Sequence, residues 1–196
     1  MDNNWFEMLK KENVNLITDK INYINQNSII TNNNSYNIDA IVAATGFNAG
    51  KMIWPIKVIG KKGINLNDYW ENDNPRAHIG ITVPNFPNFF MMYGPNTNLA
   101  HGGSIVFQGE CQIRYILGCI SLLLEKNYNN MDCKIESYIK YNTKLDEQHG
   151  KMVWTHNKVD SWYRNKSGRV TTNSPWRLVD YWNFTKEPKA NDYLFK

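Results

Sequence analysis

Residues that could contact a flat, redox-active ligand occur at three places in the chain. At the first, Thr45, Gly46 and Phe47 form a corner directly after an apolar run. A glycine in such a corner lets the backbone approach a planar ring without a Cβ in the way. Taken alone, a Thr-Gly pair after an apolar run is equally typical of an ordinary tight turn.

The second place is the turn Gly94-Pro95-Asn96, which ends an apolar run and leads toward Ser104. Ser104 is a predicted N-cap, because serine at this position can accept a hydrogen bond from the first turn of a helix. The positive end of the helix dipole would stabilise a ligand that becomes anionic on reduction. The alternative interpretation is an ordinary turn followed by a capped helix, with no ligand bound.

The third place combines neighbouring rings with an arginine. Trp162 and Tyr163 stand shortly before the sequence GRVTTN, which contains Arg169. Rings beside a guanidinium can stack on and clamp a nucleotide. The alternative is a surface aromatic side chain tucked under the chain.

Composition excludes several classes of function. The net charge is only +4, and the lysines and arginines are scattered, so a nucleic-acid partner is not expected. The three cysteines form no CxxC pair, which argues against a metal site and favours free thiols in a cytoplasmic protein. The most apolar stretch, residues 115–124, is too short to span a bilayer, so no membrane partner is expected.

Apolar periodicity predicts the elements that position these residues. Residues 1–10 read as the end of a helix, and the patterns that follow predict short strands at 14–18, 20–24 and 28–31. Continuous apolar runs at 38–44 and 88–93 predict buried strands of a parallel sheet. Helical spacing predicts helices over 104–126 and 136–154, and the remainder reads as loop with a mobile aromatic tail.

The order of these pieces carries a family resemblance. The runs IDAIVAATGF, VPNFPNFFMMYGPNTN, HGGSIVFQGECQIRYI and DSWYRN with GRVTTN together resemble class B flavoprotein monooxygenases, in the Baeyer–Villiger branch with acetophenone- and steroid-type enzymes. The resemblance implies an α/β fold: the C-terminal portion of a flavoprotein with two dinucleotide-binding domains, with partial parallel sheet, long helices and an irregular C-terminal tail. It assigns 1–36 to the tail of the NADPH-binding domain, 37–130 to the C-terminal part of the FAD-binding domain, and 131–196 to a helix with a cofactor-covering loop and tail.

The resemblance also implies roles for single residues. The cofactor-binding residues would be Thr45, Gly46, Phe47, Gly94, Pro95, Asn96, Ser104 and Trp162, with FAD and NADPH as the cofactors. Leu99 and His101 would line the substrate side. The family's active-site arginine is expected just before Trp5, so we expect no catalytic residue within the chain.

The implied activity is insertion of one oxygen atom from O2 into a ketone, or alternatively into a nitrogen or other heteroatom. No GxGxxG loop occurs in the sequence, although the family carries two such loops to hold the pyrophosphates of its cofactors. We therefore expect the chain to be a fragment, either a truncated product or one half of a split enzyme, that is inactive without a partner chain carrying those loops. The alternative from a different class is a non-catalytic interaction module.

Overall fold

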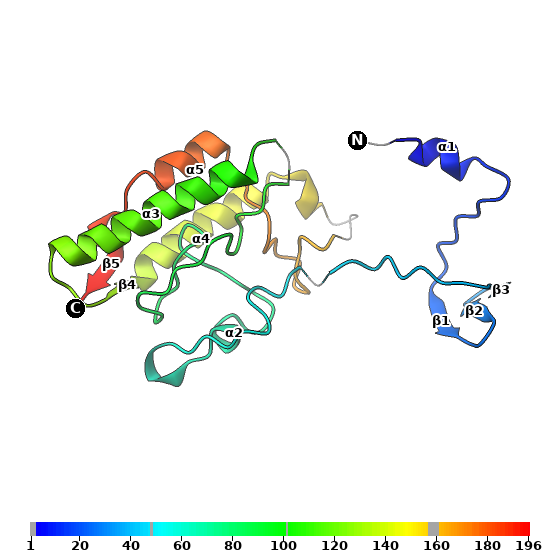
Figure 1. The fold of residues 1–196 in the computed structure, drawn as a ribbon, viewed down its shortest axis with the longest axis horizontal. Coiled ribbons are helices and arrows are strands. Elements are labelled where there is room, and N and C mark those ends of the chain that lie inside the picture. The colour runs from blue at the N-terminus through cyan, green and yellow to red at the C-terminus, as the bar shows by residue number, and fades with distance from the viewer. Residues whose placement is uncertain (1–2, 48, 101, 157–160) are drawn as a thin grey trace. The chain divides into compact units, whose positions relative to one another are not determined.

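The computed structural model describes residues 3–47, 49–100, 102–156 and 161–196. The chain forms two separately packed units, residues 1–47 and 48–196. Figure 1 shows the larger unit as a set of helices around irregular segments, and the smaller unit as a short helix with a small sheet.

The smaller unit is built from local antiparallel pairing. It contains α1 (Trp5–Leu9), β1 (Ile21–Ile24), β2 (Ser28–Thr31) and β3 (Ser35–Asn37), and the strands pair in the order β1-β2-β3. The turn between β1 and β2 is closed by Asn25, whose side-chain oxygen accepts the Ser28 backbone N–H at 2.7 Å. Asparagine at such a turn favours this local bond. The predicted helix end and the strands at 20–24 and 28–31 are thereby confirmed.

Two strand predictions in this unit are wrong. Residues 14–18 and 38–44 are not strands, although both carry the expected apolar residues. Val42 leaves 90% of its surface exposed, so the run at 38–44 is apolar but not buried. A strand needs a continuous ladder of hydrogen bonds to a neighbour. The Ile38 N–H donates to the Asn27 carbonyl at 2.9 Å, but no ladder continues from it among the described residues.

Two helices dominate the larger unit. In α3 (Ile105–Glu125) the buried positions recur at helical spacing, and its Ser104 N-cap accepts a hydrogen bond from the Phe107 N–H at 3.4 Å. The second helix, α4 (Ile135–His149), ends earlier than predicted, and a 3-10 turn, η2 (Val153–Thr155), follows it. Both helix predictions are confirmed over most of their length.

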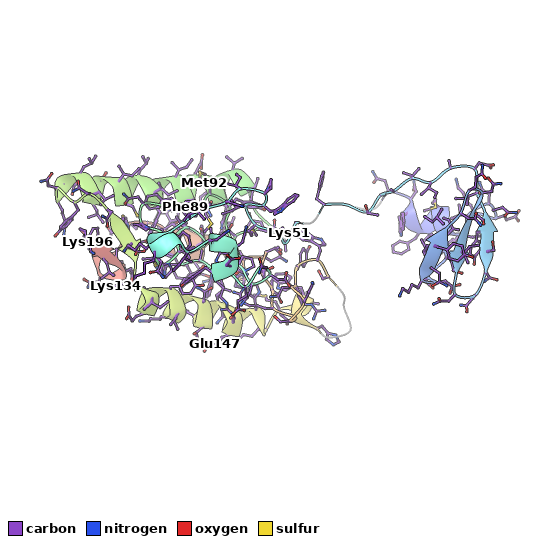
Figure 2. The ribbon with its side chains drawn as sticks, turned by 90° about the horizontal axis from the view of Figure 1, so that it is seen from below. Lys51, Phe89, Met92, Lys134, Glu147 and Lys196 are labelled. Atoms are coloured by element: carbon purple, nitrogen blue, oxygen red, sulfur yellow. The ribbon has the colours of Figure 1, made fainter. Side chains whose placement is uncertain are left out.

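The irregular segment 49–100 packs against both helices, and Figure 2 shows the side chains of the larger unit from below. From this segment, Ile79 and Ile81 pack into the main core with Tyr115 of α3 and Tyr138 of α4. A second apolar cluster lies within the segment, around η1 (Lys61–Gly63) and α2 (Leu66–Tyr69), and its buried members are Leu66, Trp70, Ala77, Val83, Phe86 and Met91. The segment therefore supplies much of the core without regular structure.

The predicted parallel strand at 88–93 is wrong. Both Asn88 and Tyr93 have left-handed backbone angles, with φ of 57° and 56°, which interrupt an extended chain. Its hydrogen bonds go to different partners: the Met91 N–H donates to the Ile81 carbonyl, and the Tyr93 N–H donates to the Gln112 side chain. The named strands of the described residues all pair antiparallel.

The C-terminal tail has more structure than predicted. It contains α5 (Leu178–Phe184), the 3-10 turn η3 (Ala190–Asp192) and β5 (Tyr193–Phe195). Strand β5 pairs antiparallel with β4 (Met131–Cys133), and the Tyr193 side chain is 3% exposed. The predicted mixed α/β fold class is confirmed, whereas the prediction of a mobile tail without regular structure is wrong. Within the described part of the chain, no helix has the length and apolarity needed to cross a bilayer.

The cap of α3 gives a first prediction. Replacing Ser104 by Ala is expected to lower the free energy of unfolding by about 1 kcal/mol, because the Phe107 N–H loses its side-chain acceptor. Urea denaturation measures this change. Ser104→Asp should retain stability, and Ser121→Ala on the exposed side of α3 is the matched control; an equal effect at Ser104 and Ser121 would exclude the capping role.

Candidate functional site

The turn Gly94-Pro95-Asn96 is buried and tightly packed. A Cβ built on Gly94 would lie 2.4 Å from the Gly80 carbonyl oxygen, so only glycine fits at this approach. Asn96 itself has φ of 59°, a left-handed conformation that asparagine tolerates. The Thr97 hydroxyl donates to the Gly94 carbonyl at 2.7 Å and closes the turn. These contacts fix the backbone of the turn.

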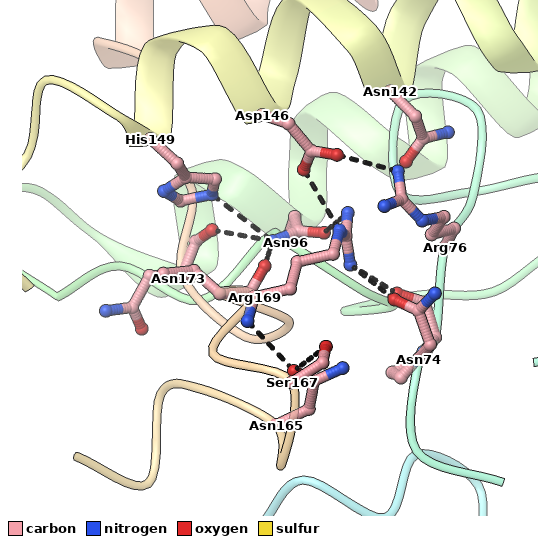
Figure 3. A network of polar contacts seen from close by, with 12 residues as sticks. Asn74, Arg76, Asn96, Asn142, Asp146, His149, Asn165, Ser167, Arg169 and Asn173 are labelled. Atoms are coloured by element: carbon pink, nitrogen blue, oxygen red, sulfur yellow. Dashed lines mark hydrogen bonds and ion pairs between the residues drawn. The ribbon is translucent and has the colours of Figure 1, made fainter. Parts of the chain in front are cut away.

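The Asn96 side chain is fully engaged in a polar network, shown in Figure 3. Its Nδ2 donates to the carbonyls of Val170 at 2.8 Å and of Asn173 at 3.2 Å. Its Oδ1 accepts from Arg169 Nη2 at 3.2 Å. Asn96 is 2% exposed, and its side-chain amide is committed to these protein partners.

Arg169 connects this turn to α4. Its Nε donates to Asp146 Oδ1 at 3.0 Å, and the other carboxylate oxygen accepts from Arg76 Nη1 at 2.8 Å. Burial lowers the pKa of Arg169 to about 10, while the charge of Asp146 acts in the opposite direction. The guanidinium therefore keeps its charge near neutral pH, and Asp146 of α4 pairs with both Arg76 and Arg169 (Figure 3).

His149 stands one turn after Asp146 on the same face of α4. The Trp154 indole Nε1–H donates to its Nδ1 at 3.1 Å, and its Nε2 lies 3.3 Å from Asn96 Nδ2. Because an indole can only donate, Nδ1 carries no proton and the neutral ring is protonated on Nε2. Burial, aided by the charge of Arg169, lowers the pKa of His149 to about 4. The ring is therefore neutral near pH 7.

The loop that carries Trp162 rests on this network. The Trp162 ring is 57% exposed and lies 4.6 Å from the Tyr163 ring, which in turn lies 6.3 Å from the Trp154 ring. The backbone is tied as well, since the Thr171 N–H donates to the Tyr163 carbonyl and the Asn96 N–H donates to the Thr171 carbonyl. Two of the three predicted ligand-contacting places are thus joined by continuous contacts.

The remaining predicted site residues have different surroundings. Ser104 is exposed at the start of α3, and Leu99 is half-buried after the turn. Thr45, Gly46 and Phe47 belong to the smaller unit, where all three are exposed. His101 lies outside the described residues. The structure therefore brings together Gly94, Pro95, Asn96 and Trp162, all within the larger unit.

Sequence reasoning missed the residues that do the joining. Asp146 and His149 are three residues apart, a spacing that puts both on one face of a helix. That spacing was the available signal, but polar residues on a helix are usually solvated, and the sequence does not show that this face is buried. Arg169 was singled out only as a neighbour of the aromatic pair.

The amino-acid sequence is similar to known monooxygenases over nearly its whole length. No family model matches it. An uncharacterised monooxygenase of Sinorhizobium fredii is 39% identical over 194 residues, covering 98% of the chain and 29% of the relative. An FAD-binding monooxygenase of Aspergillus niger is 32% identical, covering 100% of the chain and 33% of the relative. A Baeyer–Villiger monooxygenase of Pseudomonas aeruginosa is 34% identical, covering 91% and 34%. The chain belongs to the flavin-dependent monooxygenases of Baeyer–Villiger type.

Solved structures of Baeyer–Villiger-type enzymes share the fold. A steroid monooxygenase bound to NADP superposes with a TM-score of 0.79 at 21% identity, covering 99% of this chain and 38% of the other. A closed structure of cyclohexanone monooxygenase superposes with a TM-score of 0.82 at 22% identity, covering 100% and 38%. The chain thus spans between 29% and 38% of the length of these relatives.

Proposed function

We propose that the chain is the C-terminal portion of an FAD- and NADPH-dependent monooxygenase that inserts one oxygen atom from O2 into a ketone or a heteroatom substrate. The observation that carries the proposal is the continuous set of contacts from the Gly94–Asn96 turn through Arg169 to the Trp162 loop. It holds an exposed ring in a fixed relation to a rigid turn. A similar FAD-binding monooxygenase supports the choice of flavin.

The described residues fit one part of such cofactors and not another. The exposed Trp162 ring is backed by Tyr163, so it offers a flat face for stacking on a nicotinamide. The N-terminus of α3 offers the positive end of a helix dipole beside Ser104. The sequence contains no GxGxxG loop, the motif that holds the pyrophosphate in dinucleotide-binding domains.

Each residue then has a proposed role. Bound FAD, reduced by NADPH, supplies the redox chemistry with O2. We propose that Trp162 covers the nicotinamide, that Gly94–Asn96 and Ser104 face the flavin, and that Leu99 lines the substrate side. Asp146 and Arg169 act as positioning residues, because they reach the cofactor only through Asn96 and the Trp162 loop.

The smaller unit belongs to the same proposal. Thr45, Gly46 and Phe47 would face FAD from the segment that links the two dinucleotide-binding domains, with 1–36 as the tail of the NADPH-binding domain. The FAD-binding part would then be 37–130, and 131–196 would form the helix, covering loop and tail. A reducing, cytoplasmic setting fits the free, buried thiols of Cys111, Cys119 and Cys133.

We further propose that the chain is inactive alone and works with a partner that carries both dinucleotide-binding loops. Apolar side chains of α3 remain exposed, among them Ile113, Leu117 and Leu124. Together with Ile120 they recur every three to four residues along one side of the helix, as expected of a surface that another segment covers.

The test begins with the purified chain. Mixed with FAD and passed through a desalting column, the chain is expected to retain no yellow absorbance; a stoichiometric bound flavin would refute the need for a partner. A segment with both dinucleotide-binding loops, taken from the Pseudomonas aeruginosa relative, is then added. Association together with NADPH oxidation that depends on a ketone supports the proposed reaction. Oxidation that depends only on an amine or sulfide assigns the heteroatom branch.

Two variants of the chain test the proposed nicotinamide contact. In the reconstituted complex, Trp162→Ala should raise the KM for NADPH about tenfold, because the exposed ring no longer stacks on the nicotinamide. Trp54→Ala removes a ring of similar exposure from outside the site and should leave the KM unchanged. Association of the two chains without any NADPH oxidation favours the second candidate, a non-catalytic interaction module, whose supporting observation is the exposed apolar side of α3.

A further inference from the structure

A pocket of about 330 Å³ opens on the side of α4 away from the polar network of Figure 3. It is bounded by α4, by His78 and Ile79 of the irregular segment, and by residues 184–192 of the tail. Small-molecule sites in proteins are typically about 300–1,000 Å³ in volume and combine apolar walls with a few polar groups. The pocket has the size and the composition of such a site.

The floor of the pocket contains a buried polar side chain without a hydrogen bond. His78 is 5% exposed, and neither of its ring nitrogens has a hydrogen-bond partner. The nearest charge is Asp192, whose Oδ2 lies 3.7 Å from Nε2, beyond hydrogen-bond distance. Two aromatic rings make T-shaped contacts with the imidazole, Tyr141 at 5.6 Å and Tyr193 at 6.3 Å between ring centroids. Buried imidazoles normally have a hydrogen-bond partner, so both ring nitrogens of His78 are available to a ligand in the pocket.

The rim of the pocket is basic. Lys140 and Lys144 are four residues apart on α4 and so share one face, and Lys189 stands opposite them on the tail. Among the described residues none of these three lysines forms a salt bridge. Lys144 instead lies 5.6 Å above the Phe184 ring, over the apolar wall.

The carboxylates of the pocket do not cancel this charge. Asp192 accepts a hydrogen bond from the Ser137 hydroxyl at 2.8 Å, and its pKa is lowered chiefly by the neighbouring His78, so it is ionised and engaged. Glu187 is the other acidic residue of the lining. Three ammonium groups against two carboxylates leave one net positive charge at the mouth.

We propose that this pocket binds a small organic anion with an aromatic body, of the class of an aromatic monocarboxylate. The carboxylate lies between the lysines of the rim, the ring lies against Tyr141 and Phe184, and a polar edge of the ligand reaches His78. This site is separate from the cofactor contacts proposed above, and its occupation does not depend on FAD.

Calorimetric titration of the 196-residue chain with benzoate tests the proposal. Saturable binding with a stoichiometry of one is expected, and it should exceed the binding of benzamide, which has the same ring without the charge. Lys140→Ala combined with Lys144→Ala should weaken benzoate binding about tenfold or more, because charge-assisted bonds to the carboxylate are lost.

The matched control carries the same loss of charge elsewhere. Lys126→Ala combined with Lys151→Ala removes two exposed lysines that do not line the pocket, and benzoate binding should be unchanged. His78→Phe should weaken the binding of 4-hydroxybenzoate, whose hydroxyl can reach the imidazole, more than the binding of benzoate, while circular dichroism confirms an intact fold. Absence of saturable benzoate binding, equal binding of benzoate and benzamide, or equal losses in the two double variants would each overturn the proposal.

Discussion

Replacing Asp146 by Ala is expected to lower the free energy of unfolding by about 2–3 kcal/mol. The change removes the carboxylate that accepts from both Arg76 and Arg169, and it leaves the Arg169 charge, whose side chain is 11% exposed, without a counter-ion. A fully buried pair would cost more; the 35% exposure of Asp146 reduces the effect through solvent screening. Urea denaturation followed by far-ultraviolet circular dichroism gives the measurement.

An exposed pair of the same chemistry serves as the control. Arg177 and Asp180 form a bond of 2.7 Å on the surface of α5, and Arg177→Ala is expected to leave the stability of the chain unchanged. Asp146→Asn, which keeps the shape and one acceptor oxygen, should fall between wild type and Asp146→Ala. If Asp146→Ala were as stable as wild type, the network would not hold the Gly94–Asn96 turn against α4.

The same network shows what the sequence could predict about the fold. The helices over 104–126 and 136–154 follow from apolar spacing, because helical contacts are local and the pattern is complete within the segment. The strands at 38–44 and 88–93 do not form, because a strand depends on a neighbour that local pattern cannot supply. Strand β5 was missed for the converse reason: its partner β4 lies about sixty residues earlier in the sequence, as the pair Met131 and Phe195 illustrates.

The site residues likewise divide into those that a local motif identifies and those that depend on contacts distant in sequence. Family motifs drew attention to Gly94–Asn96 and to Trp162, and the structure joins these places in one unit. The residues that join them, Asp146 and His149, carry no motif, and their roles depend on burial by segments far away in sequence. The prediction that Asn96 contacts a cofactor remains untested, but its amide is already committed to Arg169 and two carbonyls.

Acid is expected to destabilise the chain through His149. Its pKa is lowered from 6.5 to about 4 in the folded protein, mainly by burial, so between these values the unfolded chain binds a proton that the folded chain does not. The corresponding stability is fully present above pH 6.5 and is lost as the pH falls toward 4, an effect of roughly 3 kcal/mol. Protonation would place an N–H on Nδ1 opposite the Trp154 N–H, which is a second physical reason for the direction.

The variant His149→Gln isolates this contribution, because glutamine can accept from Trp154 but does not titrate. The substitution also changes the packing, and this shifts the free energy of unfolding by the same amount at every pH. The diagnostic quantity is therefore the slope of the free energy of unfolding against pH between pH 6.5 and 4. We expect a steep loss in wild type and a shallow one in the variant, measured by urea denaturation at each pH. Parallel curves would show that the imidazole is solvated enough to titrate normally, and the packing of His149 between Asn96 and Trp154 would then have to be abandoned.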